Sequence, residues 1–340
     1  MKRKYFLQQY MHNEYLHGGV TNVDAEKALF ADGFEPVLFP YQQNFSIKAK
    51  LGRMSFLLKK ILSIKKGAVV VFLSPFYARM DKLFIQLLRI KGITLICYIV
   101  DIDGIKDGND DLLKEEVAFF RKLKYFIVLN DSMKKWLAET VPGAISAPVY
   151  FHTFFTRPVI QQRQKSFDVV FAGNLAKSPF LGQLHLLKQT SPGVRFNVYG
   201  PGPTQSMINQ ENVTYYGVQK PYDLPNKLSG SFGLIWEGNS VERPEGSIGH
   251  YIQYITHHKL SLYIVSGLPI IIAATAGTAP LVEKYKIGVT VKSLFEIEEK
   301  IRSISDEDFY QMQINMQPIA ERISNGSYLT NAVNEIMEQT

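Results

Sequence analysis

Short apolar runs of strand length alternate with amphipathic, helix-length segments along almost the whole chain. Nearly continuous apolar runs such as Val69–Leu73 are typical of parallel strands that are covered on both faces. The expected strands of the first half are Lys4–Gln9, Pro36–Phe39, Val69–Leu73, Thr94–Val100 and Tyr125–Val128. The expected helices between them are Asn22–Ala31, Arg53–Ser63, Met80–Arg89, Asp110–Leu123 and Asp131–Glu139. This alternation favours a parallel sheet with helices on both faces.

The same alternation begins again after residues 141–166, a stretch with Pro, Gly, Gln and Arg that predicts an interdomain connection. The expected strands of the second half are Asp168–Ala172, Arg195–Tyr199, Val213–Tyr216, Phe232–Trp236, Pro269–Ala273 and Gly288–Val291. The expected helices are Pro179–Lys188, Tyr222–Leu228, Lys259–Val265, Ala279–Lys286, Leu294–Ile304, Asp306–Ile319 and Tyr328–Glu338. The predicted fold class is therefore α/β, with two Rossmann-like, doubly wound domains facing a cleft. We expect the domains to cover residues 1–155 and 156–320, followed by a C-terminal helical segment, 321–340.

Composition limits the class of protein further. Apolar residues make up 46% of the 340 residues and charged residues 20%, which excludes a disordered, collagen-like or coiled-coil chain. No apolar run reaches the length of a bilayer-spanning helix. The single cysteine, Cys97, lies in an expected strand, where a buried structural thiol is favoured, and one cysteine fits a reducing compartment. Since the residues after the basic start are too polar for a signal peptide, we expect a cytoplasmic protein.

The net charge of +7 indicates an anionic partner, and the charge is concentrated in one segment. Residues 47–66 contain seven basic residues and no acidic one. Apolar residues at helical spacing within this segment are Ile47, Leu51, Met54, Leu58 and Ile61. The basic helix, 48–66, could face the core with a solvated lysine face, or it could rest on the inner face of a membrane. Because RNA-binding signatures are missing, nucleic acid is not an expected partner.

Glycine-containing loops after the expected strands are candidates for phosphate binding. Gly18, Gly19 and Thr21 open the first helix, where unpaired N–H groups could bind an anion or a sugar hydroxyl. The Thr21 side chain, like that of Asp24, is better explained as a helix cap. In the second half, Gly173, Asn174 and Lys177 repeat the pattern, and a solvated lysine explains Lys177 equally well. Further residues at strand ends that leave room for a base or a ribose, or that simply make turns, are Tyr199, Gly200 and Tyr216.

Carboxylates and a lysine follow the expected strand Phe232–Trp236. Glu237, Ser240 and Glu242 could bind the hydroxyl groups of a ribose or a sugar. Lys259 enters the next helix, whose first amides and ammonium group together suit a pyrophosphate. The neighbouring His257 and His258 lack a third ligand, so we interpret them as surface or capping residues and expect no metal site.

Asp101 and Asp103 come directly after the expected strand Thr94–Val100. A carboxylate at this edge of the sheet is a candidate general base that deprotonates an acceptor hydroxyl. Asp103 is more simply explained as a cap or turn residue, and the pair could also hold a divalent ion. Because the chain contains neither G-x-S-x-G nor a complete G-x-G-x-x-G, hydrolase and dehydrogenase functions are disfavoured.

These residues together resemble the GT-B glycosyltransferases of bacterial surface-polysaccharide synthesis, and in particular the β-1,6-galactofuranosyltransferases of O-antigen assembly. The similar segments lie in both halves: Asp101–Asp103, Phe171–Leu175, Phe232–Glu242, His258–Tyr263, Leu268–Pro269 and Ser324–Tyr328. The chain is also similar to glucosyltransferases that extend O-glycans on bacterial adhesins. These resemblances imply a UDP-sugar donor, an acceptor bound to the first domain, and a terminal helix that crosses back to that domain.

The resemblance also implies roles for individual residues. Lys177, Tyr216 and Lys259 match positions that hold the nucleotide diphosphate. The adjoining residues Leu260, Ser261 and Tyr263 belong to the same nucleotide-sugar segment. Retaining GT-B enzymes carry two glutamates where this chain has Tyr254 and Leu262, which favours an inverting reaction with Asp101 as base.

The leading functional hypothesis is a metal-independent galactofuranosyltransferase that uses no cofactor besides its UDP-sugar donor. The acceptor would be a glycan or a polyprenyl-diphosphate-linked sugar. A glucosyltransferase that uses UDP-glucose and acts on a glycoprotein glycan is the alternative enzyme. A nucleotide- or sugar-binding module without catalysis is the alternative from another class, and a homo-oligomer is left open.

Overall fold

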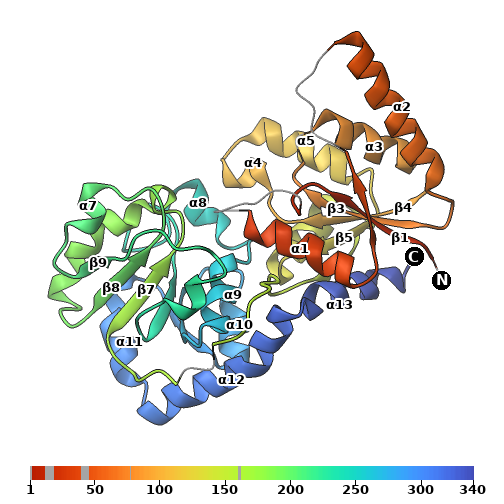
Figure 1. Ribbon diagram of the computed structural model, residues 1–340. Helices are drawn as coiled ribbons and strands as arrows, with labels where there is room; N and C mark the ends of the chain where they lie inside the picture. The colour runs from red at the N-terminus through yellow and green to blue at the C-terminus, as the bar shows by residue number, and fades with distance from the viewer. Residues whose placement is uncertain (1, 12–18, 40–45, 77, 160–161) are drawn as a thin grey trace.

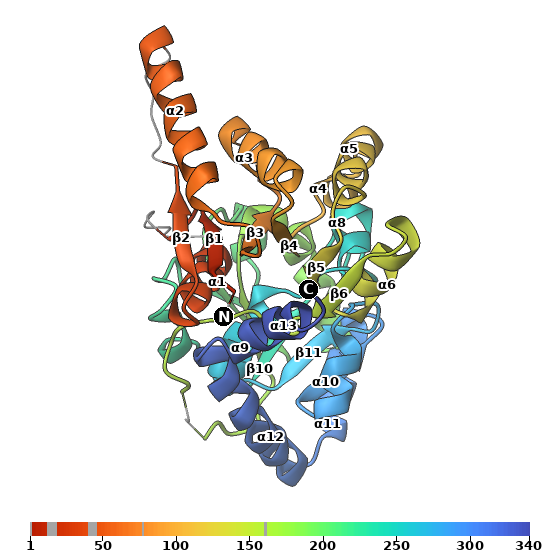
Figure 2. The same ribbon diagram turned by 90° about the vertical axis from the view of Figure 1, so that its right-hand side faces the viewer.

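The computed structural model describes residues 2–11, 19–39, 46–76, 78–159 and 162–340. Within these ranges the chain forms two six-stranded sheets, and every strand pair is parallel (Figure 1). Helices lie on the faces of both sheets (Figures 1 and 2). The α/β prediction with two doubly wound domains is confirmed.

The first sheet has the strand order β2-β1-β3-β4-β5-β6. Its strands are β1 Lys4–Gln8, β2 Glu35–Leu38, β3 Val69–Ser74, β4 Thr94–Ile99, β5 Tyr125–Val128 and β6 Ile145–Pro148. Its helices are α1 Val20–Ala31, α2 Ile47–Ser63, α3 Arg79–Ile90, α4 Asp103–Lys106, α5 Asp110–Phe120 and α6 Asp131–Thr140. The central strand β3 is buried along its whole length, as its continuous apolar sequence predicts.

The second sheet has the order β12-β11-β10-β7-β8-β9, so the chain starts in the middle, builds one side and then returns to build the other. Its strands are β7 Asp168–Ala172, β8 Arg195–Tyr199, β9 Val213–Tyr215, β10 Phe232–Ile235, β11 Ile270–Ala273 and β12 Gly288–Val291. Its α-helices are α7 Gln205–Ile208, α8 Gly246–Tyr251, α9 His258–Val265, α10 Ala279–Tyr285, α11 Ile297–Ser303 and α12 Asp306–Ser324. Its 3₁₀-helices are η1 Leu175–Lys177, η2 Pro179–Gln189, η3 Leu224–Asn226 and η4 Leu294–Glu296.

Several sequence-based expectations were wrong in detail. The stretch 141–166 is not only a connection, because it contributes β6 to the edge of the first sheet. The expected helix Tyr222–Leu228 is only the short turn η3, and the expected helix Pro179–Lys188 is the 3₁₀-helix η2. The basic helix α2 begins at Ile47 rather than at Arg53 because the Ser46 hydroxyl accepts a hydrogen bond from the Ala49 N–H and caps it.

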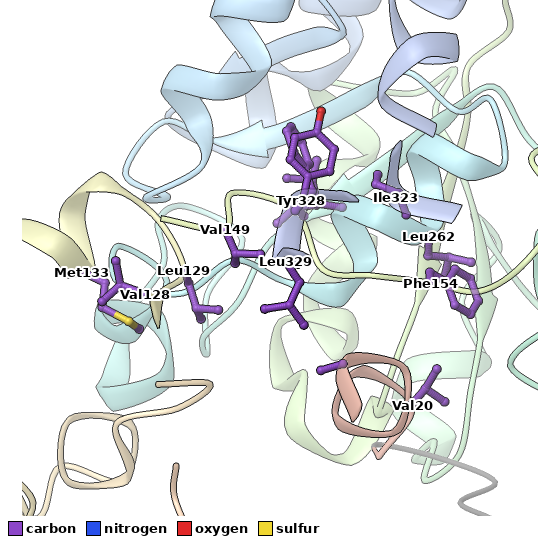
Figure 3. Packing of buried hydrophobic residues seen from close by; sticks show 14 of the residues in the cluster. Val20, Val128, Leu129, Met133, Val149, Phe154, Leu262, Ile323, Tyr328 and Leu329 are labelled. Carbon is purple, nitrogen blue, oxygen red and sulfur yellow. The ribbon is translucent and has the colours of Figure 1, made fainter. Parts of the chain in front are cut away.

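The last helix, α13 Ser327–Met337, leaves the second domain and packs on β5, β6 and α1 of the first. Figure 3 shows Tyr328 and Leu329 of α13 between first-domain side chains such as Val149 and second-domain side chains such as Leu262. The Tyr328 ring lies 4.9 Å from the Phe151 ring, centroid to centroid. One apolar core therefore continues from the first domain into the second. No helix in the described ranges has the length and apolar character needed to cross a bilayer.

Two tyrosine–aspartate hydrogen bonds join the domains. The Tyr222 hydroxyl donates to Oδ1 of the buried Asp24 on α1 over 2.7 Å, and Oδ2 of Asp24 accepts from the Phe155 N–H. Tyr251 of α8 donates to Asp101 Oδ1 over 3.1 Å. Asp24 is therefore an interdomain contact and not a cap, which corrects its sequence-based interpretation. The two contacts lie where loops at the carboxyl ends of strands and the start of α1 approach the other domain.

A close contact under β10 gives a test of this packing. An added Cβ at Gly233 would lie 2.3 Å from the Tyr263 ring, so we expect Gly233→Ala to lower the free energy of unfolding by about 1–3 kcal/mol. At Gly52 on α2 an added Cβ meets no atom within 4 Å, so Gly52→Ala should be neutral or slightly stabilising. Urea unfolding of both variants measures the difference. Equal stability of the two variants would contradict the close contact between Gly233 and the Tyr263 ring.

Candidate active site between the domains

A cavity of about 330 Å³ lies at the carboxyl ends of β7 and β8, opposite the start of α1. The second sheet reverses its direction of growth between β7 and β10, and doubly wound folds bind ligands at this switch point. The cavity is lined by Val20, Thr21, Phe154, Ala172, Gly173, Asn174, Tyr199, Gly200, Pro201, Val218, Gln219, Pro221, Leu224, His257, His258, Lys259 and Leu262. Residues from both domains and from the connection between them therefore form one site.

Lys259 is held firmly at this switch point. Its Nζ donates to Glu237 Oε1 over 2.5 Å and lies 4.3 Å from the centroid of the Phe171 ring. Only 14% of the Lys259 side chain is exposed. Gly173 makes room for it, because an added Cβ there would lie 2.9 Å from Lys259 Cε. The ammonium group is thus fixed beside the first turn of α9, whose N–H groups have no partners within the helix.

The carboxylate of Glu237 carries the opposite charge of this site. It follows β10 and is buried, and His257 Nε2 lies 3.4 Å from its Oε1. Burial alone would raise the pKa of Glu237, but Lys259 and His257 outweigh burial and lower the pKa to about 2. Glu237 is therefore ionised at neutral pH and forms a buried ion pair with Lys259.

His258 lines the cavity and has an unpaired polar atom. Its buried Nε2 has no hydrogen-bond partner among the described residues, and its ring packs edge-on against Phe154 with centroids 4.8 Å apart. Burial, together with the nearby His152, lowers the pKa of His258 to about 3, so the ring is neutral at pH 7. A buried ring nitrogen without a partner is costly unless a ligand completes it. Interpreting His258 as a surface or capping residue was therefore wrong.

An aromatic stack borders the cavity at the end of β8. The Tyr199 and Tyr216 rings are nearly parallel, at 9° with centroids 4.8 Å apart. The Tyr199 hydroxyl donates to the Lys227 carbonyl and accepts from the Ser229 N–H, which anchors the stack from below. Tyr199 is buried, whereas 42% of Tyr216 is exposed. The pair offers a rigid aromatic edge beside the cavity.

Asp101 lies at the interdomain surface but does not line this cavity. Its Oδ2 accepts from Lys106 over 3.2 Å, and its Oδ1 accepts from Tyr251, whose oxygen also accepts from the Ile102 N–H. Partial burial raises the pKa of Asp101, although Lys106 opposes this effect. Asp103 is buried at the start of α4 and pairs with the same lysine. The structure brings Asp101 and Asp103 together at Lys106, and neither lines the cavity beside Lys259.

Other predicted site residues fall into distinct places. Six of the predicted residues line the cavity: Thr21, Gly173, Asn174, Tyr199, Gly200 and Lys259. Gly19 is the N-cap residue of α1, and Gly18 lies outside the described residues. Lys177 is exposed on η1, away from the cavity lining. Ser240 accepts a hydrogen bond from the N–H of the exposed Glu242, and neither lines the cavity.

Three residues of α9 that were expected to bind nucleotide lie in the core instead. Leu260, Ser261 and Tyr263 are fully buried. The Ser261 hydroxyl donates to the His152 carbonyl, and the Tyr263 oxygen accepts from the Ala172 N–H. Their position follows from the helical period: a short helix that presents His258, Lys259 and Leu262 to the cavity turns the residues of its opposite side into the protein.

Some residues that line the cavity were not predicted from the sequence. The segment with Val218, Gln219 and Pro221 closes one side of the cavity, and Phe154 closes another. Only the proximity of Pro221 to an expected strand end could have pointed to that segment, because Phe154 belongs to a stretch without a regular pattern. Among the described residues, no group of three or more His, Cys, Asp or Glu side chains is arranged to hold a metal ion.

The amino-acid sequence of this chain is similar to those of known sugar-transferring enzymes. Residues 4–141 match the family model described as "Glucosyltransferase 3-like, N-terminal domain", and residues 169–336 match "Glucosyltransferase 3-like, C-terminal domain". Beta-1,6-galactofuranosyltransferase WbbI of Escherichia coli K12 is 27% identical over 74% of this chain and 73% of that protein. Glucosyltransferase 3 of Streptococcus gordonii is 26% identical over 81% of this chain and 82% of that protein.

Solved structures share the fold over the whole chain. Sucrose-phosphate synthase from Thermosynechococcus elongatus has a TM-score of 0.67 at 12% identity and covers 100% of this chain and 99% of its own. Alr3699/HepE from Anabaena, solved in complex with UDP, has a TM-score of 0.66 at 14% identity and covers both chains completely. The two-domain architecture is therefore that of the GT-B fold.

The buried ion pair predicts a pH-dependent stability. The pKa of Glu237 is lowered in the folded state, so its ionisation contributes about 3 kcal/mol to the free energy of unfolding. This contribution is present above pH 4.5, and it is lost as the pH falls towards 2. In Lys259→Met only His257 still opposes the effect of burial, so we expect the pKa of Glu237 to rise and the variant to lose stability as the pH rises. We expect Lys259→Met to be destabilised by about 3 kcal/mol at pH 8 and clearly less at pH 5.

Urea unfolding at the two pH values measures this difference. Lys177→Met is the matched control, because it removes an exposed lysine from the same domain and should leave stability unchanged at both pH values. An equal loss at pH 5 and pH 8 in Lys259→Met would show that Glu237 does not depend on Lys259 for its charge.

Proposed function

Because this chain belongs to the glucosyltransferase 3-like family, we propose that it transfers a hexose from a UDP-sugar to a hydroxyl group of a glycan or lipid-linked acceptor. The observation that carries this proposal is the fixed ammonium of Lys259 at the switch point of the second sheet, inside a cavity shared by both domains. Galactofuranose is the first candidate sugar, since a galactofuranosyltransferase is among the relatives, and glucose is the second.

The cavity suits the two parts of a nucleotide diphosphate. The Tyr199–Tyr216 stack and the adjoining segment around Val218 offer aromatic and apolar surface to a nucleoside. Lys259 and the first N–H groups of α9 suit the diphosphate, because both present positive charge to one point. In the proposed reaction these groups stabilise the negative charge that develops on the leaving UDP, so that no metal ion is needed.

His258 is suited to a neutral contact with the donor. Its ring carries no charge at pH 7, and its buried Nε2 lacks a partner among the described residues. A hydrogen bond to a donor hydroxyl or phosphate oxygen would satisfy this atom. We assign His258 to donor binding on this ground.

Asp101 is the proposed base of an inverting transfer. It stands at the carboxyl end of β4, its side chain is 38% exposed, and partial burial raises its pKa, which suits proton uptake from an acceptor hydroxyl. Asp103 is more closely bound to Lys106 and starts α4, so we give it a positioning role. Tyr251 couples Asp101 to the second domain, which connects the base to the domain that holds the donor.

Nucleotide binding tests the donor site. Calorimetric titration in the presence of EDTA should give UDP a higher affinity than GDP, and Lys259→Ala should weaken UDP binding by about 10–100-fold, the value of a charge-assisted hydrogen bond. Lys177→Ala should bind UDP normally, since Lys177 lies outside the cavity. If Lys177→Ala loses affinity and Lys259→Ala does not, the diphosphate binds elsewhere. Adding Mg²⁺ should leave the affinity unchanged.

Turnover tests the catalytic assignment. With UDP-galactofuranose and UDP-glucose screened as donors, Asp101→Asn should lower kcat by about 100-fold or more, while UDP affinity stays unchanged. Asp111→Asn, on the exposed face of α5, is the matched control and should retain activity. Full activity of Asp101→Asn would exclude Asp101 as the base. UDP-sugar binding without UDP release, with every acceptor tried, would favour a binding module over an enzyme.

A further inference from the structure

Helix α2 has an apolar face that no described part of the chain covers. Only two of its side chains, Leu57 and Ile61, are buried against the first domain. Large apolar residues three or four positions apart follow one another along its solvent side: Ile47, Leu51, Met54, Leu58 and Leu62. Between 40% and 78% of each of these residues is exposed. We call these five residues the α2 stripe; a continuous apolar surface of this kind marks an interaction site.

Basic residues border the α2 stripe. By helical spacing, Lys48 and Lys59 lie along one side of it and Lys50 along the other, and all three are exposed. Lys65 and Lys66 follow directly after the helix, and residues 47–66 contain no acidic side chain. Of the five apolar residues expected on one face, only Ile61 is therefore core-facing; Leu57, which was not among them, is buried beside it. An apolar stripe between lysines is the pattern of a helix that lies in a membrane interface.

The placement of α2 leaves this surface accessible. α2 stands out from the first domain at the end away from the second domain (Figures 1 and 2). Lys91 on the neighbouring segment donates to the Ile61 and Ile64 carbonyls and so fixes the C-terminal end of α2 to the domain. The helix is thus anchored at one end and presents its stripe outward.

We propose that the α2 stripe docks the protein onto a membrane surface that contains anionic lipids. The apolar side chains would enter the boundary between headgroups and acyl chains, and the lysines would contact lipid phosphates. A second copy of this chain is the less favourable occupant, because a two-fold symmetric contact would bring two helices that carry only positive charge against each other. The proposal is independent of the donor chemistry, because it concerns only the opposite end of the first domain.

Vesicle co-sedimentation tests the proposal without any substrate. The full chain should bind vesicles of phosphatidylcholine with about 30% phosphatidylglycerol, and binding should be at least about tenfold weaker to phosphatidylcholine alone. Raising the salt concentration from about 0.1 M to 0.5 M should weaken binding to the anionic vesicles, since the Debye length shortens. No preference for anionic vesicles would overturn the proposal.

Variants separate the stripe from the charge. Leu51→Glu/Leu58→Glu places two carboxylates on the stripe and should reduce binding to anionic vesicles by at least about tenfold, with an unchanged melting temperature because both positions are exposed. Leu186→Glu is the matched control, since Leu186 is 48% exposed on η2 of the second domain, and it should bind like the unmodified chain. Lys48→Gln/Lys59→Gln should lower the salt dependence while leaving the apolar stripe intact.

Sedimentation velocity distinguishes the other occupant. If the unmodified chain is an oligomer that Leu51→Glu/Leu58→Glu converts into monomers, and neither protein binds vesicles, the α2 stripe is a self-association surface and the proposal fails. If both proteins have the same mass in solution and only the unmodified chain binds anionic vesicles, the membrane is the occupant. This test does not measure UDP binding, so failure of the membrane proposal would not contradict the proposed donor site.

Discussion

The buried ion pair between Lys259 and Glu237 organises the candidate active site. Taking two charges out of water is costly, and a pair of this kind persists only where its geometry is well satisfied. Here the end of β10 leads into the carboxylate, the start of α9 supplies the ammonium, and Gly173 at the end of β7 leaves space for the Lys259 side chain. Because the three elements meet at the reversal point of the sheet, the position of the pair is a consequence of topology.

The ion pair also explains how an anion could bind without a large rearrangement. An ammonium group has three donors, and Glu237 occupies one of them. The Phe171 ring covers Lys259 on one side, and Lys259 lines the cavity. A diphosphate placed there meets a charge that is already oriented, beside the N-terminal end of α9. The side-chain entropy of Lys259 is therefore lost when the protein folds and not when the anion binds.

Sequence patterns predicted most of this arrangement where the interactions are local. Strand and helix periods gave the two sheets, and the position of Lys259 at a helix start placed it near a strand end. The strand β6 was missed because its sequence, which ends in Pro148, lacks an apolar run and is specified by pairing with β5. The roles of Asp24 and His258 were also missed, because each depends on residues more than a hundred positions away: Asp24 on Tyr222, and His258 on Phe154 and His152.

Leu260, Ser261 and Tyr263 illustrate a different limit. A segment next to a functional lysine looks functional in sequence, but a helix of eight residues that is covered by a sheet must bury most of its surface. The same ambiguity applied to α2, where periodicity alone could not tell a core-facing side from an exposed one. The structure separates the two cases, because α9 packs against β10 and β11 whereas α2 is held by Leu57, Ile61 and a lysine at its end.

The two domains therefore differ in what they expose. The second domain brings Lys259 and Tyr199 to a cavity at the interdomain surface, while the first presents an apolar and basic helix at its far end. Attachment through α2 would leave the interdomain surface free, because α2 stands out from the first domain on the side away from the second domain (Figure 1). Asp101, which follows β4 and bonds to Tyr251 of the second domain, belongs to the interdomain surface that this attachment leaves free. With this division, the protein would bind a lipid-linked acceptor at a membrane surface and a UDP-sugar donor from solution.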